Sequence, residues 1–193
     1  TGELSCEINV PSAQGLALWQ AVMRSGEAHG LTPYGTQTMH VLRAEKGYII
    51  VGQDTDGTLT PGDLGMDWIV SREKDFIGKR SFSRSDTARP GRKQFVGLLP
   101  KNPQFVALEG SHLVADAARS RYSTESGSPS IGHITSSYYS PNLETGFALA
   151  LVTGGRALMG QTILCVNGTA LIPMSVTDPV FFDKEWTRRY GIA

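Results

Sequence analysis

The chain has 193 residues, enough to bury a sizeable core in one domain or two, and its 18 basic and 18 acidic side chains leave no net charge. This balance argues against general attraction to nucleic acid or to a membrane surface, and we find neither an apolar stretch that could span a bilayer nor a signal peptide. Cys6 and Cys165 lie far apart in the sequence, in strand-like runs, so we expect reduced, packed thiols and a soluble, cytoplasmic protein.

The opening segment is predicted to be a β-strand. The alternation in residues 5–10 places apolar side chains on one face and Glu7 among the polar side chains on the other. A strand carboxylate matches a pair of parallel N–H donors, as in an arginine fork or at the edge of a pterin ring. The alternative is a glutamate that is simply solvated on the strand surface.

Two helices are predicted next. Residues 15–28 carry apolar side chains at helical spacing, and Trp19 is expected in the core. A second helix is predicted from Thr36, a suitable N-cap, to Lys46, because Gly47 follows where left-handed backbone closes a helix. Short strands are predicted at residues 48–51 and 66–70, which together with the helices indicate an α+β unit.

Between residues 71 and 93 the apolar periodicity fades. Eight basic and three acidic side chains give this stretch a local charge of +5. It is either a solvated linker that turns at Pro90-Gly91, or a functional surface that guides an anionic ligand tail or docks an acidic partner.

Beyond residue 93 the pattern is all β. Short, regularly spaced strands with glycine and proline between them favour a compact barrel or sandwich. Asn167-Gly168 predicts a type I′ hairpin turn with both residues at positive φ, and residues 120–130 are expected to form a mobile loop. The predicted strands are residues 95–99, 112–115, 130–136, 147–152, 162–166 and 170–176.

Other motifs carry little weight. Residues 54–57 (DTDG) resemble a calcium loop only briefly, because Gly52 and Asp63 stand where the first acidic ligand and the bidentate glutamate belong. The four histidines lie at no metal-ligand spacing, and the chain has neither a G-x-S-x-G elbow nor a G-x-G-x-x-G fingerprint. We therefore predict no metal site and no dinucleotide site in this segment.

Several of these segments together resemble one family, the tetrahydrofolate-dependent aminomethyltransferases, whose type member is the glycine cleavage T-protein. The matching segments are TGELSCEINVP with Glu7, the helix end LRAEKG at 42–47, the turn at 52–61, Trp68, and GHITSSYYSP at 132–141. The resemblance spans nearly the whole chain and is closest to the sarcosine oxidase branch. It implies an α+β fold in which a truncated half of the T-protein folate-binding domain (1–85) is followed by a basic linker (86–93) and a C-terminal antiparallel β-barrel (94–193).

The resemblance also implies a function. The family binds tetrahydrofolate, so Glu7 is expected to hold the pterin edge and Trp68 to wall the pocket, with Tyr34 as a weaker candidate. The implied partners are folate, a one-carbon imine intermediate and the other subunits of a hetero-oligomeric oxidase, with flavins and NAD elsewhere in the complex and neither nucleic acid nor membrane involved. The family's catalytic aspartate is expected to precede Thr1, so we predict no catalytic residue here and no turnover by this chain alone.

Two departures from the T-protein pattern separate the alternatives. Met39 aligns with an arginine of the T-protein, and His40 aligns with an aspartate. This difference disfavours transfer from a lipoyl carrier protein and favours the amine-oxidising branch. A T-protein-type aminomethyltransferase, a non-enzymatic folate-binding regulator and a structural assembly module remain the other readings.

Overall fold

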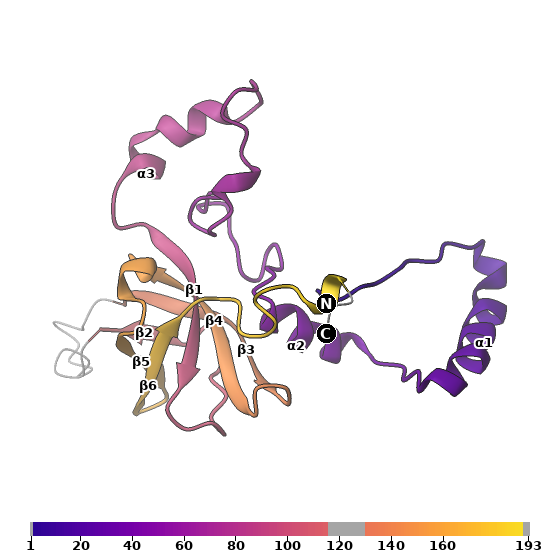
Figure 1. Ribbon diagram of the computed structural model, residues 1–193. Coiled ribbons are helices and arrows are strands. Elements are labelled where there is room, and N and C mark those ends of the chain that lie inside the picture. Colours follow the sequence, from indigo (N-terminus) through magenta and orange to yellow (C-terminus); the bar gives the residue numbers. More distant parts are fainter. Residues whose placement is uncertain (1, 116–129, 191–193) are drawn as a thin grey trace.

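The C-terminal half of the chain closes into a six-stranded antiparallel barrel in the computed structural model, which describes residues 2–115 and 130–190 (Figure 1). The strand order around the barrel is β1-β4-β3-β2-β5-β6. All six predicted strands are present, and the α+β class with a C-terminal antiparallel barrel is confirmed. The strands are β1 (Lys93–Pro100), β2 (His112–Val114), β3 (Gly132–Ser140), β4 (Thr145–Thr153), β5 (Thr162–Asn167) and β6 (Ala170–Thr177).

Strand β4 is buried on both of its faces. Its inward side chains, Ala148, Ala150 and Val152, belong to the cluster that fills the barrel. The alternate side chains, including Leu149 and Leu151, belong to a second cluster outside the barrel wall, which takes in Ala44 of the preceding unit. Because successive strand side chains point to opposite faces, one strand serves both the barrel interior and the contact with the N-terminal half.

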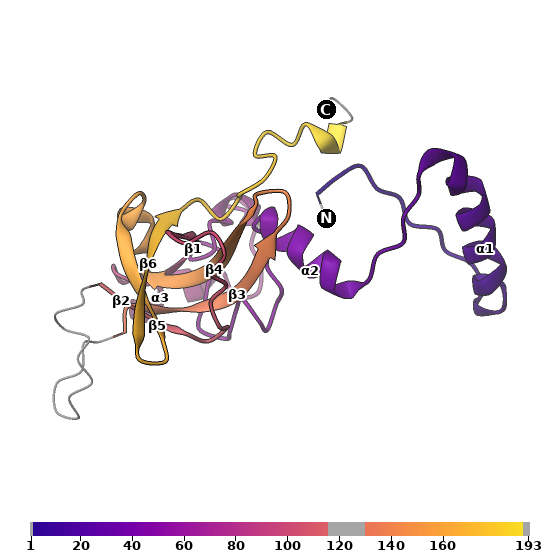
Figure 2. The ribbon, with the colours of Figure 1, turned by 90° about the horizontal axis from the view of Figure 1, so that it is seen from below.

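The N-terminal half contains two main helices, α1 (Gly15–Gly26) and α2 (Thr36–Glu45), with short 3-10 turns η1 (Ser12–Gln14) and η2 (Glu27–His29) beside α1. Both helices were predicted. Helix α2 lies against the barrel, whereas α1 stands apart from it in two perpendicular views (Figures 1 and 2). The end of α2 follows the prediction, because Gly47 has a φ of 67°.

Three sequence predictions for the N-terminal half are wrong. Residues 5–10 are not a strand and Cys6 is exposed, because the segment pairs with no other strand among the described residues. Trp19 is 55 % exposed, since α1 stands away from the core. The N-cap of α2 is Gly35 rather than Thr36, and Gly35 has no side chain to bond the helix amides.

Two further predicted strands are absent. Residues 48–51 form an irregular segment and a turn, and residues 66–70 contain the 3-10 turn η3 (Asp67–Ile69). Ile49 packs on the second cluster beside the barrel, whereas Val51 and Trp68 are exposed. The short apolar runs therefore predicted neither a strand nor, at Val51 and Trp68, a buried side chain.

The segment before the barrel forms an arm that projects from it and carries η4 (Lys79–Ser83) and the short helix α3 (Ser85–Ala88) (Figure 1). After β4 comes η6 (Gly155–Leu158), and η7 (Arg188–Tyr190) lies near the C-terminus. No helix within the described ranges is both long and apolar enough to cross a membrane.

The β5–β6 turn differs from the prediction by one residue. Asn167 pairs with Ala170, so the two turn residues are Gly168 and Thr169, and only Gly168 has positive φ, at 59°. The ladder extends one pair further than expected, which removes Asn167 from the turn. The mobile loop predicted at 120–130 lies, apart from Ser130, outside the described residues.

Candidate functional site

A hollow of about 620 Å³ lies where the N-terminal half, the barrel and the C-terminal segment meet. Trp68, one of the three predicted binding residues, forms part of its wall and is 81 % exposed. The wall is otherwise mostly apolar, and Arg156 and Asp178 are its two charged side chains. A hollow of this size and character is typical of a site for a small organic ligand.

Glu7 and Tyr34 do not line this hollow. Glu7 is exposed, and its carboxylate makes no hydrogen bond with any residue that the structure describes. Tyr34 is 59 % exposed and lies just before α2. The structure thus places one of the three predicted residues at the hollow and leaves the other two on accessible surface of the N-terminal half.

The motif at the end of α2 is buried against the barrel. Arg43, Glu45 and Lys46 are three charged residues in four positions, and each is at most 6 % exposed. Burying charge is costly unless it is paired, so each needs a partner. All three find one outside their own helix, in the turn after it, in the barrel or in the C-terminal segment.

Asp54 is the partner of Arg43 and is fully buried. Its Oδ2 accepts a hydrogen bond from Arg43 Nη1 at 2.5 Å and from the backbone N–H of Ile50 at 2.8 Å. Its Oδ1 accepts from the hydroxyls of Thr135 at 2.6 Å and Ser136 at 2.7 Å, both on β3. One carboxylate therefore joins α2, the turn that follows it and the barrel wall.

Two consecutive residues of β3 reach Asp54 because the strand is irregular there. The pairing with β4 shifts between Ile134 and Ser136, which leaves Thr135 as an extra residue. In a regular strand, neighbours point to opposite faces, whereas a bulge lets two successive side chains reach the same partner. Arg43 Nη2 also donates to the Ser136 hydroxyl, at 2.7 Å.

The other two charged residues at the end of α2, Glu45 and Lys46, also contact the barrel and the C-terminal segment. Glu45 accepts hydrogen bonds from Ser140 at 2.5 Å and Asn142 at 3.0 Å. Lys46 Nζ lies 3.1 Å from Asp183 Oδ2 and 4.5 Å from the ring centre of Trp186, so it ties down the C-terminal segment. The hydrogen bond from Thr187, and further the ammonium of Lys46, hold the pKa of Asp183 at about 2, below its usual value of 3.8, against the opposing effect of desolvation.

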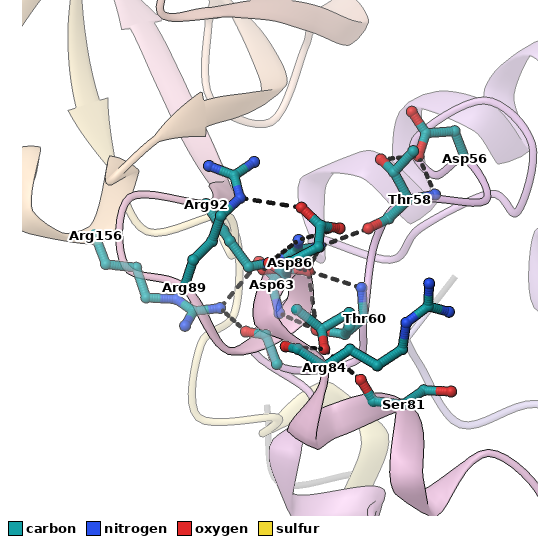
Figure 3. A network of polar contacts seen from close by, with 12 residues as sticks. Asp56, Thr58, Thr60, Asp63, Ser81, Arg84, Asp86, Arg89, Arg92 and Arg156 are labelled. Carbon is teal, nitrogen blue, oxygen red and sulfur yellow. Dashed lines mark hydrogen bonds and ion pairs between the residues drawn. The ribbon is translucent and has the colours of Figure 1, made fainter.

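A second polar network fastens the turn before Trp68 to the start of β1 (Figure 3). Asp63 accepts hydrogen bonds from Arg92 Nη2 at 2.7 Å and from the backbone N–H of Thr60 at 2.7 Å. Burial by itself would raise the pKa of Asp63, but the hydrogen bonds from Arg92 and Thr60 lower it overall. Arg92 also pairs with Asp86 on α3 at 3.4 Å, so the same arginine holds the base of the arm.

This network changes the interpretation of the basic stretch at 71–93. Three of its basic side chains, Lys79, Arg89 and Arg92, form ion pairs with acidic residues. The stretch is therefore partly folded and internally paired rather than a plain solvated linker.

These motif residues stand out in the sequence, but nothing in their local spacing indicates that they contact one another. The one local signal for these contacts is the presence of opposite charges, such as Arg43 and Asp54, beside apolar runs, because charges that are buried need partners. Their partners on β3 lie more than 80 residues away in sequence, and neither the bulge nor those contacts could be read from local spacing. Within residues 2–115 and 130–190, no group of three or more histidine, cysteine, aspartate or glutamate side chains is arranged to hold a metal ion.

Comparison with known families matches the two halves separately. Residues 1–74 match the GCVT N-terminal domain, and residues 93–183 match the glycine cleavage T-protein C-terminal barrel domain. A solved structure, the glycine cleavage system aminomethyltransferase T from Bartonella henselae, superposes with a TM-score of 0.73 at 23 % identity, over 91 % of this chain and 45 % of that one. That likeness shows the fold.

Sarcosine oxidase alpha subunits and aminomethyltransferases are among the curated relatives of this chain. The chain is 51 % identical over 191 residues to the sarcosine oxidase subunit alpha of Corynebacterium sp. (strain P-1), which covers 99 % of this chain and 19 % of that protein. The corresponding subunit of Rhizobium meliloti (strain 1021) is 38 % identical over 96 % of this chain and 18 % of its own length. The aminomethyltransferase of Halothermothrix orenii is 32 % identical over 86 % of this chain and 43 % of its own length. This chain thus spans about a fifth of the oxidase subunits.

Proposed function

Because the chain belongs to the glycine cleavage T-protein family, we propose that it is the tetrahydrofolate-binding C-terminal part of a sarcosine oxidase alpha subunit. In this proposal it captures the one-carbon unit of oxidised sarcosine as 5,10-methylenetetrahydrofolate. The oxidation itself takes place elsewhere in the complex.

The observation that carries the proposal is the difference in identity between the two groups of relatives. The chain is 51 % identical to an oxidase alpha subunit and 32 % identical to the aminomethyltransferase of Halothermothrix orenii. Met39 and His40, where the T-protein pattern has arginine and aspartate, support the same branch. A T-protein-type transferase is the second candidate, and a non-enzymatic folate-binding regulator is the third.

The residues present suit a folate. The carboxylate of Glu7 is exposed and engaged by no described residue, so its two oxygens are available to the paired N–H groups of a pterin. Trp68 offers an exposed indole face. Bound tetrahydrofolate supplies the nitrogen atoms that accept the carbon, and Glu7 contributes by orienting it, which is a proximity effect rather than acid or base chemistry. We assign no catalytic residue to this chain.

The partners follow from the same proposal. Flavins and NAD bind outside this segment, which carries no G-x-G-x-x-G fingerprint. Exposed apolar side chains on and near α1, including Leu16 and Trp19, are proposed to pack against the rest of the alpha subunit or against other subunits. We propose a cytoplasmic location for the complex.

The proposal is tested in the complete oxidase complex with a Glu7→Ala substitution. Sarcosine consumption and peroxide formation are expected to continue near wild-type rates, because Glu7 takes no part in oxidation. Methylenetetrahydrofolate is expected to fall and free formaldehyde to rise by the same amount, since an uncaptured imine hydrolyses. All three products are measured in one reaction.

Glu27→Ala is the matched control, because Glu27 is an exposed glutamate of the same half and lies in η2. It should leave the ratio of formaldehyde to folate product unchanged. If peroxide formation falls together with the folate product in a folded Glu7→Ala enzyme, the proposed division of labour is wrong. In a direct titration with folinate, Glu7→Gln should cost about 2 to 3 kcal/mol of binding free energy.

A further inference from the structure

Residues 178–190, here called the strap, follow β6 and cross the end of α2 (Figure 1). The backbone N–H groups of Phe181 and Phe182 donate to the backbone oxygen of Glu45, at 2.8 and 3.1 Å. Further along the strap, Trp186 forms part of the wall of the hollow of about 620 Å³. The strap therefore connects the last turn of α2 to the hollow.

The strap contains a turn with an unusual backbone. Asp183 and Trp186 have φ angles of 47° and 59°, and they are two of the three non-glycine residues with positive φ in the described part of the chain. Thr187 donates its backbone N–H and its hydroxyl to Asp183 Oδ1, at 2.9 and 2.6 Å, which closes the turn. A bulky residue in the left-handed region is strained, and such residues persist where surrounding contacts hold them and gather at functional sites. The conformation of Trp186 therefore needs a cause outside its own backbone.

Lys46, at the end of α2, provides that cause. Its Nζ donates to the backbone oxygen of Asp183 at 2.5 Å and to Asp183 Oδ2 at 3.1 Å, and it lies 4.5 Å from the ring centre of Trp186. The side chains of Lys46 and Asp183 are 3 % and 7 % exposed, so salt and water screen their attraction little. A desolvated ammonium over an indole face is a strong form of cation–π contact. One ammonium group thus holds both the turn and the ring.

Two further contacts restrict the ring of Trp186. The ring of Tyr48 lies with its centre 5.8 Å away and its plane inclined by 39°, and the guanidinium carbon of Arg189 lies 5.5 Å from the Trp186 ring centre. Lys46 itself does not line the hollow. Its influence on the hollow therefore passes through the position of Trp186.

We propose that Lys46 is a positioning residue for the folate site, which holds the strap closed and so fixes Trp186 as a wall of the hollow. The inference rests on the proposed function and goes beyond it, because neither Lys46 nor Trp186 has a role there. Trp186 also lies beyond residues 93–183, the stretch that matches the barrel domain. A wall that is already ordered lowers the cost of binding a ligand against it, so loss of Lys46 weakens folate binding and leaves the oxidation untouched.

The test measures folate saturation in the complete oxidase complex. Lys46→Met keeps a long unbranched side chain and removes the ammonium, so the KM for tetrahydrofolate should rise about tenfold. Peroxide formation from sarcosine, and the rate of methylenetetrahydrofolate formation at saturating folate, should stay near wild type. Lys184→Met is the matched control, because Lys184 is an exposed lysine of the same strap, and it should leave the KM unchanged. An unchanged KM in a folded Lys46→Met enzyme would overturn the proposal.

Trp186→Gly separates positioning from folding. Glycine adopts a φ of 59° without strain, so this substitution removes the ring and keeps the turn. The KM for tetrahydrofolate should rise at least as much as in Lys46→Met. Because Lys46 acts through Trp186, the double variant should raise the KM no further than Trp186→Gly alone. Additive effects of the two substitutions would refute the proposed route.

An NMR measurement tests the contact between Lys46 and Trp186 without any folate. In the 193-residue chain, Lys46→Met should move the indole N–H signal of Trp186, which is assigned by its loss in Trp186→Gly, while the signal of Trp19 on α1 stays in place. An unmoved Trp186 signal would contradict the positioning role.

The two proposals fail in different ways. If the wild-type complex forms no folate product, the proposed function fails and the positioning role fails with it. If the wild-type complex does form this product and Lys46→Met leaves the KM unchanged, only the positioning role is wrong.

Discussion

Asp54→Asn is expected to release the N-terminal half from the barrel. The substitution keeps the shape of the side chain but removes the charge that balances Arg43, whose side chain is 8 % exposed. It also places an amide N–H₂ where the carboxylate now accepts four hydrogen bonds, from Arg43, Ile50, Thr135 and Ser136. The buried guanidinium is then left without a counter-charge.

The magnitude follows from the burial of the pair. Breaking a buried ion pair by removing one partner costs about 3 to 5 kcal/mol. This is a large share of the roughly 5 to 15 kcal/mol that stabilises a typical domain. With an m-value of about 2 kcal/mol per molar urea, the unfolding midpoint should fall by roughly 2 M.

The assay combines urea unfolding with hydrogen exchange. Amides of α2 should lose protection in Asp54→Asn, whereas those of β4 in the barrel wall should lose less, because β4 also packs into the barrel interior. Arg43→Met alone should cost a similar amount. The double variant should cost less than the sum of the single variants, since the uncompensated charge is gone.

Asp56→Asn is the matched control, because Asp56 lies two residues away, is exposed and caps only the local turn at Thr58. It should cost less than about 1 kcal/mol. If Asp54→Asn shifted the urea midpoint no more than Asp56→Asn does, the buried contacts of Asp54 would not couple the two halves, and the reasoning would be refuted.

Two further outcomes are expected. The pKa of Asp183 is lowered to about 2, so its contribution to stability is present above its usual pKa of 3.8 and is lost as the pH falls toward 2. The difference in urea midpoint between wild type and Asp183→Asn should therefore be full at pH 7 and should close between about pH 4 and pH 2. A difference that stays constant with pH would contradict the pairing of Asp183. Gly47→Ala places a Cβ 2.7 Å from the backbone oxygen of Pro179 at a φ of 67°. It should lower the free energy of unfolding by about 1 to 3 kcal/mol more than the control Gly154→Ala, because Gly154 has a similar φ of 60° but open space around it. Equal melting temperatures of the two variants would show that the C-terminal segment is not held against Gly47.

The sequence by itself determined the elements whose signal is local. The barrel strands follow from short apolar runs between glycine and proline, and the end of α2 follows from Gly47. The family resemblance also came from motifs that are contiguous in the chain. A strand at residues 5–10 could not be decided in the same way, because a strand exists only where a partner provides hydrogen bonds.

Tertiary structure alone decided which motif residues meet. Asp54 joins Arg43 to a bulge at Thr135 some 80 residues later, and the hollow gathers Tyr48, Trp68, Arg156 and Trp186 from distant segments. Such contacts depend on barrel closure and on a shift in strand register, which no local pattern encodes. Exposure was decided in the same way: the amphipathic pattern of α1 predicted burial of Trp19, but a helix face is buried only where another element covers it.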